Sequence, residues 1–187
     1  MSATLTTPKT TSGGEIITHL INSTDGTGLH FDGAAGNIDI ASPPDLGTKF
    51  SWELIIQSDS FGSTNQYFID FGNGGRFLLG SHSTVDSYNL AIYDDSAWTS
   101  FGVAVLDDLK VHHLTVTIDG TAAILYDNGN QVGTTTVSAS HNIDLCTDAR
   151  IGSAVEGASE FVGGTIYRTR FWNKTLSQAE VTASYEN

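Results

Sequence analysis

The stretch from Val111 to Val137, VHHLTVTIDGTAAILYDNGNQVGTTTV, decides the fold. Within Leu114–Ile118 apolar residues alternate with threonines, so an extended segment has one apolar face and one face of hydroxyl groups. Asp119-Gly120 and Asn128-Gly129 lie between alternating runs, where a tight hairpin turn needs the positive φ that Gly and Asn adopt readily. The stretch therefore predicts three consecutive antiparallel strands.

The same period of two recurs along most of the chain, between turns rich in Gly, Asn, Asp and Ser. We expect further strands at Leu29–Phe31, Asn37–Ile40, Lys49–Gln57, Tyr67–Phe71, Arg76–Leu79, Tyr88–Tyr93, Ser100–Val105, Ala149–Gly152 and Gly164–Trp172. A helix is predicted only at Leu176–Tyr185, where Ser177 precedes Glu180 by three residues and forms a capping box. The fold class is all-β with one short C-terminal helix.

The first segment, residues 1–28, is rich in Thr, Ser and Gly and contains one apolar cluster at Ile16–Ile21. We interpret it as an N-terminal arm or anchor that precedes a domain at residues 29–187. A polar terminal arm is ordered only where something holds it. We therefore expect it to dock on its own domain or on a neighbouring chain, in a homo-oligomer.

Length, charge and hydropathy exclude several classes of protein. A chain of 187 residues is the size of one domain with a core of its own, and Cys146 is its only cysteine. With 21 acidic and 8 basic side chains the net charge is -13, which argues against nucleic acid as a partner. No apolar run approaches the ~18 residues of a membrane helix, and the N-terminus lacks the features of a signal peptide.

Several segments, in the right order, resemble the laminin G-like family of the concanavalin A-like lectin/glucanase superfamily. Val111–Gly120, VHHLTVTIDG, is similar to the family strand and turn W-H-H-V-A-V-T-Y-D-G, with Val111 in place of the usual Trp. The other matching segments are LHFDG at Leu29–Gly33 followed by NIDI at Asn37–Ile40, FSWEL at Phe50–Leu54, LYDNGNQVG at Leu125–Gly133, RIG at Arg150–Gly152, and Phe161–Val181.

The resemblance implies a jelly-roll β-sandwich of two curved antiparallel sheets, closed by the C-terminal helix. It does not fix the function, because members of the superfamily are lectins, adhesion modules, accessory domains of enzymes and viral fibres, and in a minority glycoside hydrolases.

Catalysis is not expected. Hydrolysis of a glycosidic bond needs two carboxylates that face one groove, about 5–9 Å apart. Glu53 is the only Glu within a strong predicted strand, whereas Glu156 and Glu160 lie in a loop of small residues. Among the histidines, His112 and His113 are adjacent and so face opposite sides of a strand, and we expect His113 to hydrogen-bond the backbone at the edge of the core.

A ligand site is predicted at Tyr93, Asp94, Asp95 and Trp98, where aromatic and acidic residues alternate beside a turn. An aromatic face stacks on the C–H groups of a sugar, and carboxylates accept hydrogen bonds from its hydroxyls. Calcium is left open as a cofactor, because Asp94-Asp95 with Asp86 nearby offer hard oxygen ligands. Trp98 could equally belong to the core, where we place Trp52, Phe68, Phe71 and Phe171 outright.

We expect a non-catalytic surface recognition or adhesion module that binds carbohydrate, carried on a virion as a decoration, head-fibre or tail protein. Acidity, scarce cysteine and the absence of a signal peptide suit a virion surface or an extracellular location after lysis. The partners would be a surface glycan or another capsid or virion protein. The alternatives are a purely structural assembly protein without glycan affinity and, third, a glycoside hydrolase of the same superfamily.

Overall fold

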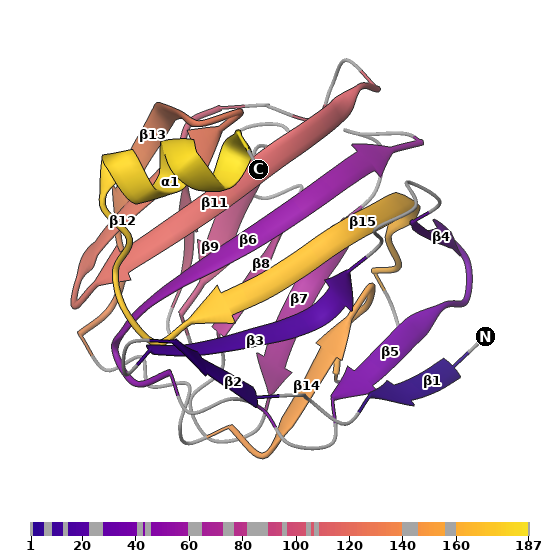
Figure 1. Ribbon diagram of the computed structural model, residues 1–187. Helices are drawn as coiled ribbons and strands as arrows, with labels where there is room; N and C mark the ends of the chain where they lie inside the picture. Colours follow the sequence, from indigo (N-terminus) through magenta and orange to yellow (C-terminus); the bar gives the residue numbers. More distant parts are fainter. Residues whose placement is uncertain are drawn as a thin grey trace.

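The computed structural model describes fifteen strands and one helix within residues 2–5, 9–12, 15–22, 28–40, 43, 46–59, 65–72, 77–81, 90–94, 97–103, 106, 109–139, 146–155 and 160–186. Side chains are described from residue 28 onward, except at residue 90. The strands form two sheets that pack face to face as a jelly-roll sandwich, as predicted (Figure 1).

Sheet A contains the following strands, in spatial order: β1 (Ser2–Leu5), β5 (Asn37–Ile40), β14 (Asp148–Ile151), β7 (Gln66–Gly72), β8 (Phe77–Ser81), β9 (Leu90–Tyr93) and β10 (Trp98–Ser100). Its neighbours are antiparallel, apart from the parallel pair of β1 and β5.

Sheet B follows the order β13 (Asn130–Thr136), β12 (Ala122–Asp127), β11 (Val111–Asp119), β6 (Lys49–Ser58), β15 (Gly163–Trp172), β3 (Glu15–Asn22) and β2 (Lys9–Ser12). A further strand, β4 (Leu29–Asp32), pairs with the first residues of β15. All neighbouring strands of sheet B, β4 and β15 included, are antiparallel. The helix α1 (Gln178–Tyr185) lies across the outer face of sheet B, over β11, β12 and β13 (Figure 1).

The meander predicted at Val111–Val137 is confirmed as β11, β12 and β13. Asn128 and Gly129 connect β12 to β13 with φ values of 50° and 78°, which is the double positive φ of a two-residue hairpin turn. Gly120 follows β11 with a φ of 62°. The turn chemistry read from the sequence therefore sets the register of this half of sheet B.

One predicted strand is wrong. The strand β10 covers Trp98–Ser100, whereas the prediction was Ser100–Val105. Residues 101–103 are not in a strand, and residues 104–105 lie outside the described residues. The reason is the turn before it: the short β9–β10 hairpin pairs Trp98 with Tyr93 and Ser100 with Ala91, so the strand begins directly after the turn. Phe101 then enters the core between the sheets.

Three strands come from the segment predicted as an arm. β1 pairs with β5 at the edge of sheet A, and β3 pairs with β15 in sheet B. The arm therefore docks on its own chain, which is one of the two positions expected. Its Thr- and Ser-rich sequence has no apolar alternation from which β1 or β2 could be predicted. Its function as an anchor stays a prediction.

The core lies between the two sheets and contains the aromatic residues predicted for it. Trp52, Phe68, Phe71 and Phe171 are all at most 2% exposed. Trp52 stacks on Phe171 with ring centroids 6.0 Å apart, and its indole nitrogen donates to Thr169 Oγ1 at 2.7 Å. The polar atom of the largest buried side chain is thus satisfied inside the core.

A bulge in β15 decides which of its side chains face out. The register to β6 shifts between Ile166 and Arg168, so one additional residue, Tyr167, interrupts the alternation. After the bulge Thr169 and Phe171 face the core, and Arg168 and Arg170 face the outer side of sheet B. Without the bulge the two arginines would point into the sandwich.

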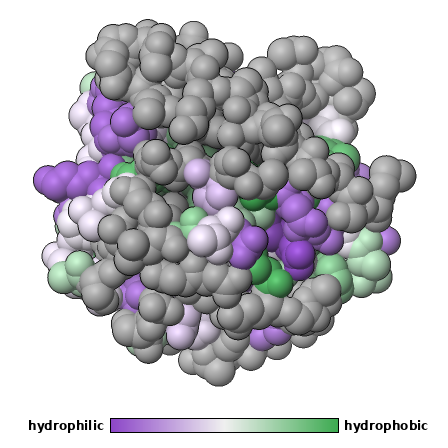
Figure 2. All heavy atoms as spheres, turned by 90° about the horizontal axis from the view of Figure 1, so that it is seen from below, coloured by the Kyte–Doolittle hydropathy of each residue, from purple (hydrophilic) through white to green (hydrophobic). Residues whose placement is uncertain are grey.

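Within the described part of the chain, no helix has the length and apolar character needed to cross a membrane. The face seen in Figure 2, from below the view of Figure 1, shows strongly hydrophilic side chains next to hydrophobic ones. The visible described side chains form no continuous hydrophobic area on this face.

Candidate functional site

Three aromatic side chains gather on the outer face of sheet A, and we call Tyr67, Tyr93 and Trp98 the aromatic platform. The ring of Trp98 lies 5.6 Å from that of Tyr67 and 5.6 Å from that of Tyr93, measured between centroids. Within the platform Tyr67 is buried and packs with Leu78 and Ala154, whereas Tyr93 and Trp98 are half-buried. The structure thus brings together two of the four predicted site residues.

The β-ladder explains why these side chains meet. Leu78, Tyr93 and Trp98 are cross-strand partners on β8, β9 and β10, so they stand in one row. The alternation puts Phe77, Leu79 and Ile92 into the core on the opposite face.

Asp94 occupies the turn between Tyr93 and Trp98, where its carboxylate is directed to backbone amides. Oδ1 accepts a hydrogen bond from the N–H of Ala97 at 3.2 Å, and Oδ2 accepts from the N–H of Ser138. The residue is buried. Asp94 therefore shapes the hairpin and ties it to the segment after β13, which differs from the direct sugar contact expected. Asp95 lies outside the described residues.

The calcium hypothesis rests on residues that the structure covers only in part. Both carboxylate oxygens of Asp94 accept backbone hydrogen bonds, while Asp86 and Asp95 fall outside the described residues. Among the side chains that are described, no three of His, Cys, Asp or Glu gather in a way that could hold a metal ion.

The row of the platform continues across sheet A as a charged row. Asp39, Arg150 and Asp70 are cross-strand partners on β5, β14 and β7, and Asp70 is in turn the partner of Leu78. Arg150 Nε donates to Asp39 Oδ1 at 2.7 Å. The row thus runs from a half-exposed ion pair at one end to two aromatic rings at the other.

The segment after β14 lies on this row. Arg150 Nη1 donates to the carbonyl of Ala154 at 2.8 Å, and the N–H of Val155 donates to Asp70 Oδ2 at 2.9 Å. The side chain of Val155 packs over Gly72, where an added Cβ would lie 2.9 Å from its Cγ1. Ala154 and Val155 therefore cover the middle of the row and border the aromatic platform.

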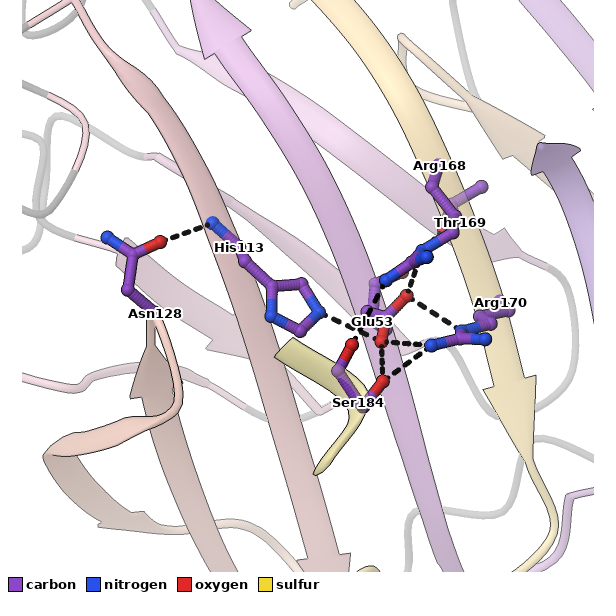
Figure 3. Close-up of polar contacts among 7 residues, drawn as sticks. All are labelled: Glu53, His113, Asn128, Arg168, Thr169, Arg170 and Ser184. Atoms are coloured by element: carbon purple, nitrogen blue, oxygen red, sulfur yellow. Dashed lines mark hydrogen bonds and ion pairs between the residues drawn. The ribbon is translucent and has the colours of Figure 1, made fainter. Parts of the chain in front are cut away.

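A second polar arrangement lies on the other side of the sandwich, and we call Glu53, His113, Arg168, Arg170 and Ser184 the Glu53 cluster (Figure 3). Glu53 Oε1 accepts from Nε of Arg168 at 2.7 Å and from Nε of Arg170 at 2.8 Å. Its Oε2 accepts from Arg170 Nη2 at 2.9 Å and from the hydroxyl of Ser184. Strands β6 and β15 and the helix α1 thus meet at one carboxylate.

The environment of Glu53 keeps it ionised. Burial by itself would raise the pKa of this carboxyl group, but the hydrogen bonds from His113 and Arg170 and the positive charge of Arg170 lower the pKa from 4.5 to about 2. The side chain is 0% exposed. A general acid needs the opposite shift, so Glu53 is equipped to hold structure and not to protonate a leaving group.

His113 differs from its prediction. Its Nε2 lies 2.8 Å from Glu53 Oε2, and its ring stacks on Tyr185 of α1 with centroids 5.6 Å apart. The expected hydrogen bond from the imidazole to the backbone is therefore wrong: Nε2 faces the buried carboxylate, and Nδ1 has no hydrogen-bond partner among the described residues. His112 faces the other side of the strand, as predicted, and pairs with Asp127 at 2.9 Å.

The architecture defines a class before any comparison: a jelly-roll β-sandwich with a helix on one sheet and an aromatic platform on the other. The chain belongs to the concanavalin A-like lectin/glucanases superfamily, whose laminin G-like family model matches residues 32–182. A search of the curated proteins finds no match.

Solved structures share the fold at low sequence identity. Domain 4 of AbnA, an extracellular arabinanase of Geobacillus stearothermophilus, in complex with arabinotriose is 15% identical with a TM-score of 0.60, covering 91% of this chain and 89% of that chain. The CBM40 of the Ruminococcus gnavus IT-sialidase bound to α2,3 sialyllactose is 14% identical with a TM-score of 0.65, covering 84% and 96%. NanB sialidase of Streptococcus pneumoniae is 14% identical with a TM-score of 0.61, and the match spans 84% of this chain but only 27% of that one.

Proposed function

We propose that the protein is a non-catalytic carbohydrate-binding module whose ligand lies on the outer face of sheet A, against Tyr93 and Trp98. The aromatic platform carries this proposal. Two aromatic side chains, held at a centroid distance of 5.6 Å by a short hairpin, are each partly exposed to solvent. Sugars bind to aromatic faces through their C–H groups.

Polar groups near the far end of the same outer face would suit a longer ligand that passes over Ala154 and Val155. Asp39 and Arg150 lie farther along the same cross-strand row, and the side chain of Asp39 is 42% exposed. A ligand that extends from the rings toward β5 would find an acceptor and a donor for its hydroxyl groups there. Asp94 contributes by fixing the hairpin, while the predicted contact from Asp95 remains part of the proposal.

The absence of hydrolysis is part of the proposal, and the charge state of Glu53 supports it. Glu53 lies under α1 on sheet B, and its low pKa opposes the role of general acid. On sheet A, Asp70 is 0% exposed and accepts from Val155, and Asp39 is paired with Arg150. Each of these three carboxylates has a structural partner that would have to be displaced before it could react.

Two of the similar structures lend support, as domains that were solved with sugars. Domain 4 of AbnA holds arabinotriose and the CBM40 of the Ruminococcus gnavus IT-sialidase holds α2,3 sialyllactose. Neither identity reaches 25%, so the likeness extends to the fold and the ligand class is our inference from the platform.

A location on a virion and assembly through the arm complete the proposal. Among the described strands, β1 ends sheet A and β2 ends sheet B, and an edge strand can pair with another chain. This observation favours an oligomer in which the arm is the anchor. A purely structural assembly protein without glycan affinity is the alternative.

A glycan array followed by calorimetry with the strongest neutral hit tests the binding function. Trp98→Leu keeps an apolar side chain against Tyr67 but removes the stacking face, which is worth about 1 kcal/mol, or about fivefold in Kd. Tyr185→Ala is the matched control, because it removes an exposed aromatic ring from α1 on the other sheet. Unchanged affinity in Trp98→Leu, or an array without any hit, would contradict the proposal.

A further inference from the structure

A groove on the outer face of sheet B has no part in the function proposed above. It lies between β15 and α1, has a volume of about 430 Å³, and is open to solvent along one side. Its lining includes Arg170, Trp172, Lys174, Glu180, Ala183 and Ser184. Arg170 and Ser184 belong to the Glu53 cluster, so the floor of the groove is continuous with that cluster (Figure 3).

Positive charge gathers in and next to the groove, although the protein is acidic: Arg170 and Lys174 line it, and Arg168 shares Glu53 with Arg170. Three of the eight Lys and Arg side chains lie at positions 168, 170 and 174, although the net charge of the chain is -13. Lys174 pairs with Glu180 at 2.6 Å, while Arg168 and Arg170 share the single carboxylate of Glu53. Among the Lys, Arg and Glu side chains of this region, three cations face two anions, so positive charge is in excess there.

The excess positive charge falls on guanidinium groups that are held in place. Arg170 uses Nε and Nη2 for Glu53 and Ser184, and its guanidinium carbon lies 4.9 Å from the centre of the Trp172 ring. Its side chain is only 18% exposed. Within the described residues, none of the contacts of Arg170 uses Nη1. The groove therefore contains a fixed cationic donor, and a bound carboxylate would neutralise it through a charge-assisted hydrogen bond.

We infer that the groove binds a sugar acid of monosaccharide size, with its carboxylate on Arg170. The excess of positive charge favours an anion, and the nearby carboxylates of Glu53 and Glu180 would repel a second negative charge such as that of a phosphate dianion. The rim supplies Ser184 and Glu180 as acceptors and Lys174 as a donor, a set that suits hydroxyl groups. The volume lies at the small end of ligand pockets, which suits one sugar unit.

The site is separate from the aromatic platform, because the platform lies on sheet A and the groove on sheet B. The two ligands also differ in what they require: the platform needs the apolar face of a sugar, and the groove needs its negative charge. Failure of one proposal therefore leaves the other standing.

Titration of the full chain with glucuronate, with glucose as its matched neutral partner, tests the inference by NMR. We expect glucuronate to shift the Nε–H resonance of Arg170 and the indole resonance of Trp172, and glucose at the same concentration to leave both unchanged. Sodium acetate controls for binding of a carboxylate without hydroxyl groups. Equal shifts with glucose or with acetate, or no shift with glucuronate, would overturn the inference.

Ala183 offers a pair of variants that leave the cluster intact. It is exposed on α1 and lines the groove, and both Glu and Gln are good helix formers. Ala183→Glu should weaken glucuronate binding by at least about tenfold, because a fixed negative charge then competes for Arg170. Ala183→Gln has the same size without the charge and should weaken it far less. Equal losses in both variants would show that shape and not charge governs binding, against the inference.

Discussion

Glu53 lies in the middle of β6 among large apolar side chains, yet its carboxylate is fully buried and ionised. Two guanidinium groups, an imidazole and a hydroxyl group supply the partners that water would otherwise provide. Breaking a buried ion pair at one side leaves the other charges unpaired in a low dielectric, which costs far more than the loss of a surface pair. The Glu53 side chain therefore connects β6 to β15 and α1 through hydrogen bonds and ion pairs.

The substitution Glu53→Gln should lower the free energy of unfolding by about 3–5 kcal/mol, measured by urea denaturation, because it strands Arg168 and Arg170. Asp119→Asn is the control. It removes an ion pair to Lys49 in which both side chains are more than half exposed, and should cost at most about 1 kcal/mol. Similar losses in the two variants would contradict the account of Glu53.

The contribution of the Glu53 carboxylate to stability should depend on pH. The pKa of Glu53 is about 2 in the folded chain and 4.5 when unperturbed, so its contribution is complete above pH 4.5 and is lost as the pH falls toward 2. We expect the difference in unfolding free energy between the natural chain and Glu53→Gln to shrink over this interval. Glu180, whose pKa is also lowered to about 2, is present in both proteins and cancels in the comparison. A constant difference would mean that Glu53 is not ionised.

The sequence contained a signal for this cluster that was missed. A Glu amid the apolar residues of Phe50–Ile56 must find a cation if its strand is buried, and Arg168 and Arg170 are two residues apart on a strand, so they share a face. Their pairing could not be derived, because Glu53 is separated from these partners by more than a hundred residues and the bulge in β15 sets which face the arginines occupy.

At the scale of elements, α1 depends on few contacts. Val181 is its only buried residue among those described, and it packs with Tyr126, Trp172 and Leu176. Ser177 forms the predicted capping box with Glu180. A helix of eight residues is too short to be stable alone, so α1 is stabilised by its cap and by its contacts to sheet B.

Ser177→Ala should therefore lower the unfolding free energy by about 1 kcal/mol, because the amide of Glu180 loses its acceptor. Glu180→Gln should lower the unfolding free energy less than Ser177→Ala through its effect on the cap, because Gln can also form a capping box at this position. Urea denaturation of both variants checks this order. A Ser177→Ala protein as stable as the natural chain would show that the cap contributes nothing.

Deletion of residues 1–28 should leave a folded sandwich that no longer assembles. The family match begins at residue 32, and the core side chains that the structure describes, all from Phe31 onward, pack with one another between the sheets. Circular dichroism would verify folding, and light scattering would measure the mass of the full and the shortened chain. An unfolded product would make the arm part of the core, and an unchanged oligomeric mass would refute its function as an anchor.

Elements with strong alternation were predictable, and elements set by context were not. The β11–β13 meander and α1 follow from turn and capping residues within each segment. Trp98 illustrates the opposite case: the sequence left it between core and surface, and the structure places it half-buried on Tyr67 because the β9–β10 hairpin positions both rings. Strands of the arm form because the edges of both sheets offer partners, and that information lies outside the arm itself.

For the whole molecule, the sandwich separates two different outer faces. Sheet A carries the aromatic platform and the Asp39–Arg150 pair, while sheet B carries α1, the Glu53 cluster and the groove beside it. The two faces share a core but no described side chain that belongs to both arrangements. Neutral and acidic sugars should therefore bind independently.

One measurement tests the central claim most directly: a two-dimensional 1H–15N NMR titration of the full chain with the strongest neutral hit from the glycan array. The three tryptophans report on separate places, since Trp52 lies in the core, Trp172 beneath the groove, and Trp98 on the platform. We expect the indole of Trp98 and the amides of Tyr93 and Val155 to shift while the indoles of Trp52 and Trp172 stay unchanged. Shifts confined to α1 and β15, with Trp98 unmoved, would contradict the assignment of the carbohydrate site to sheet A.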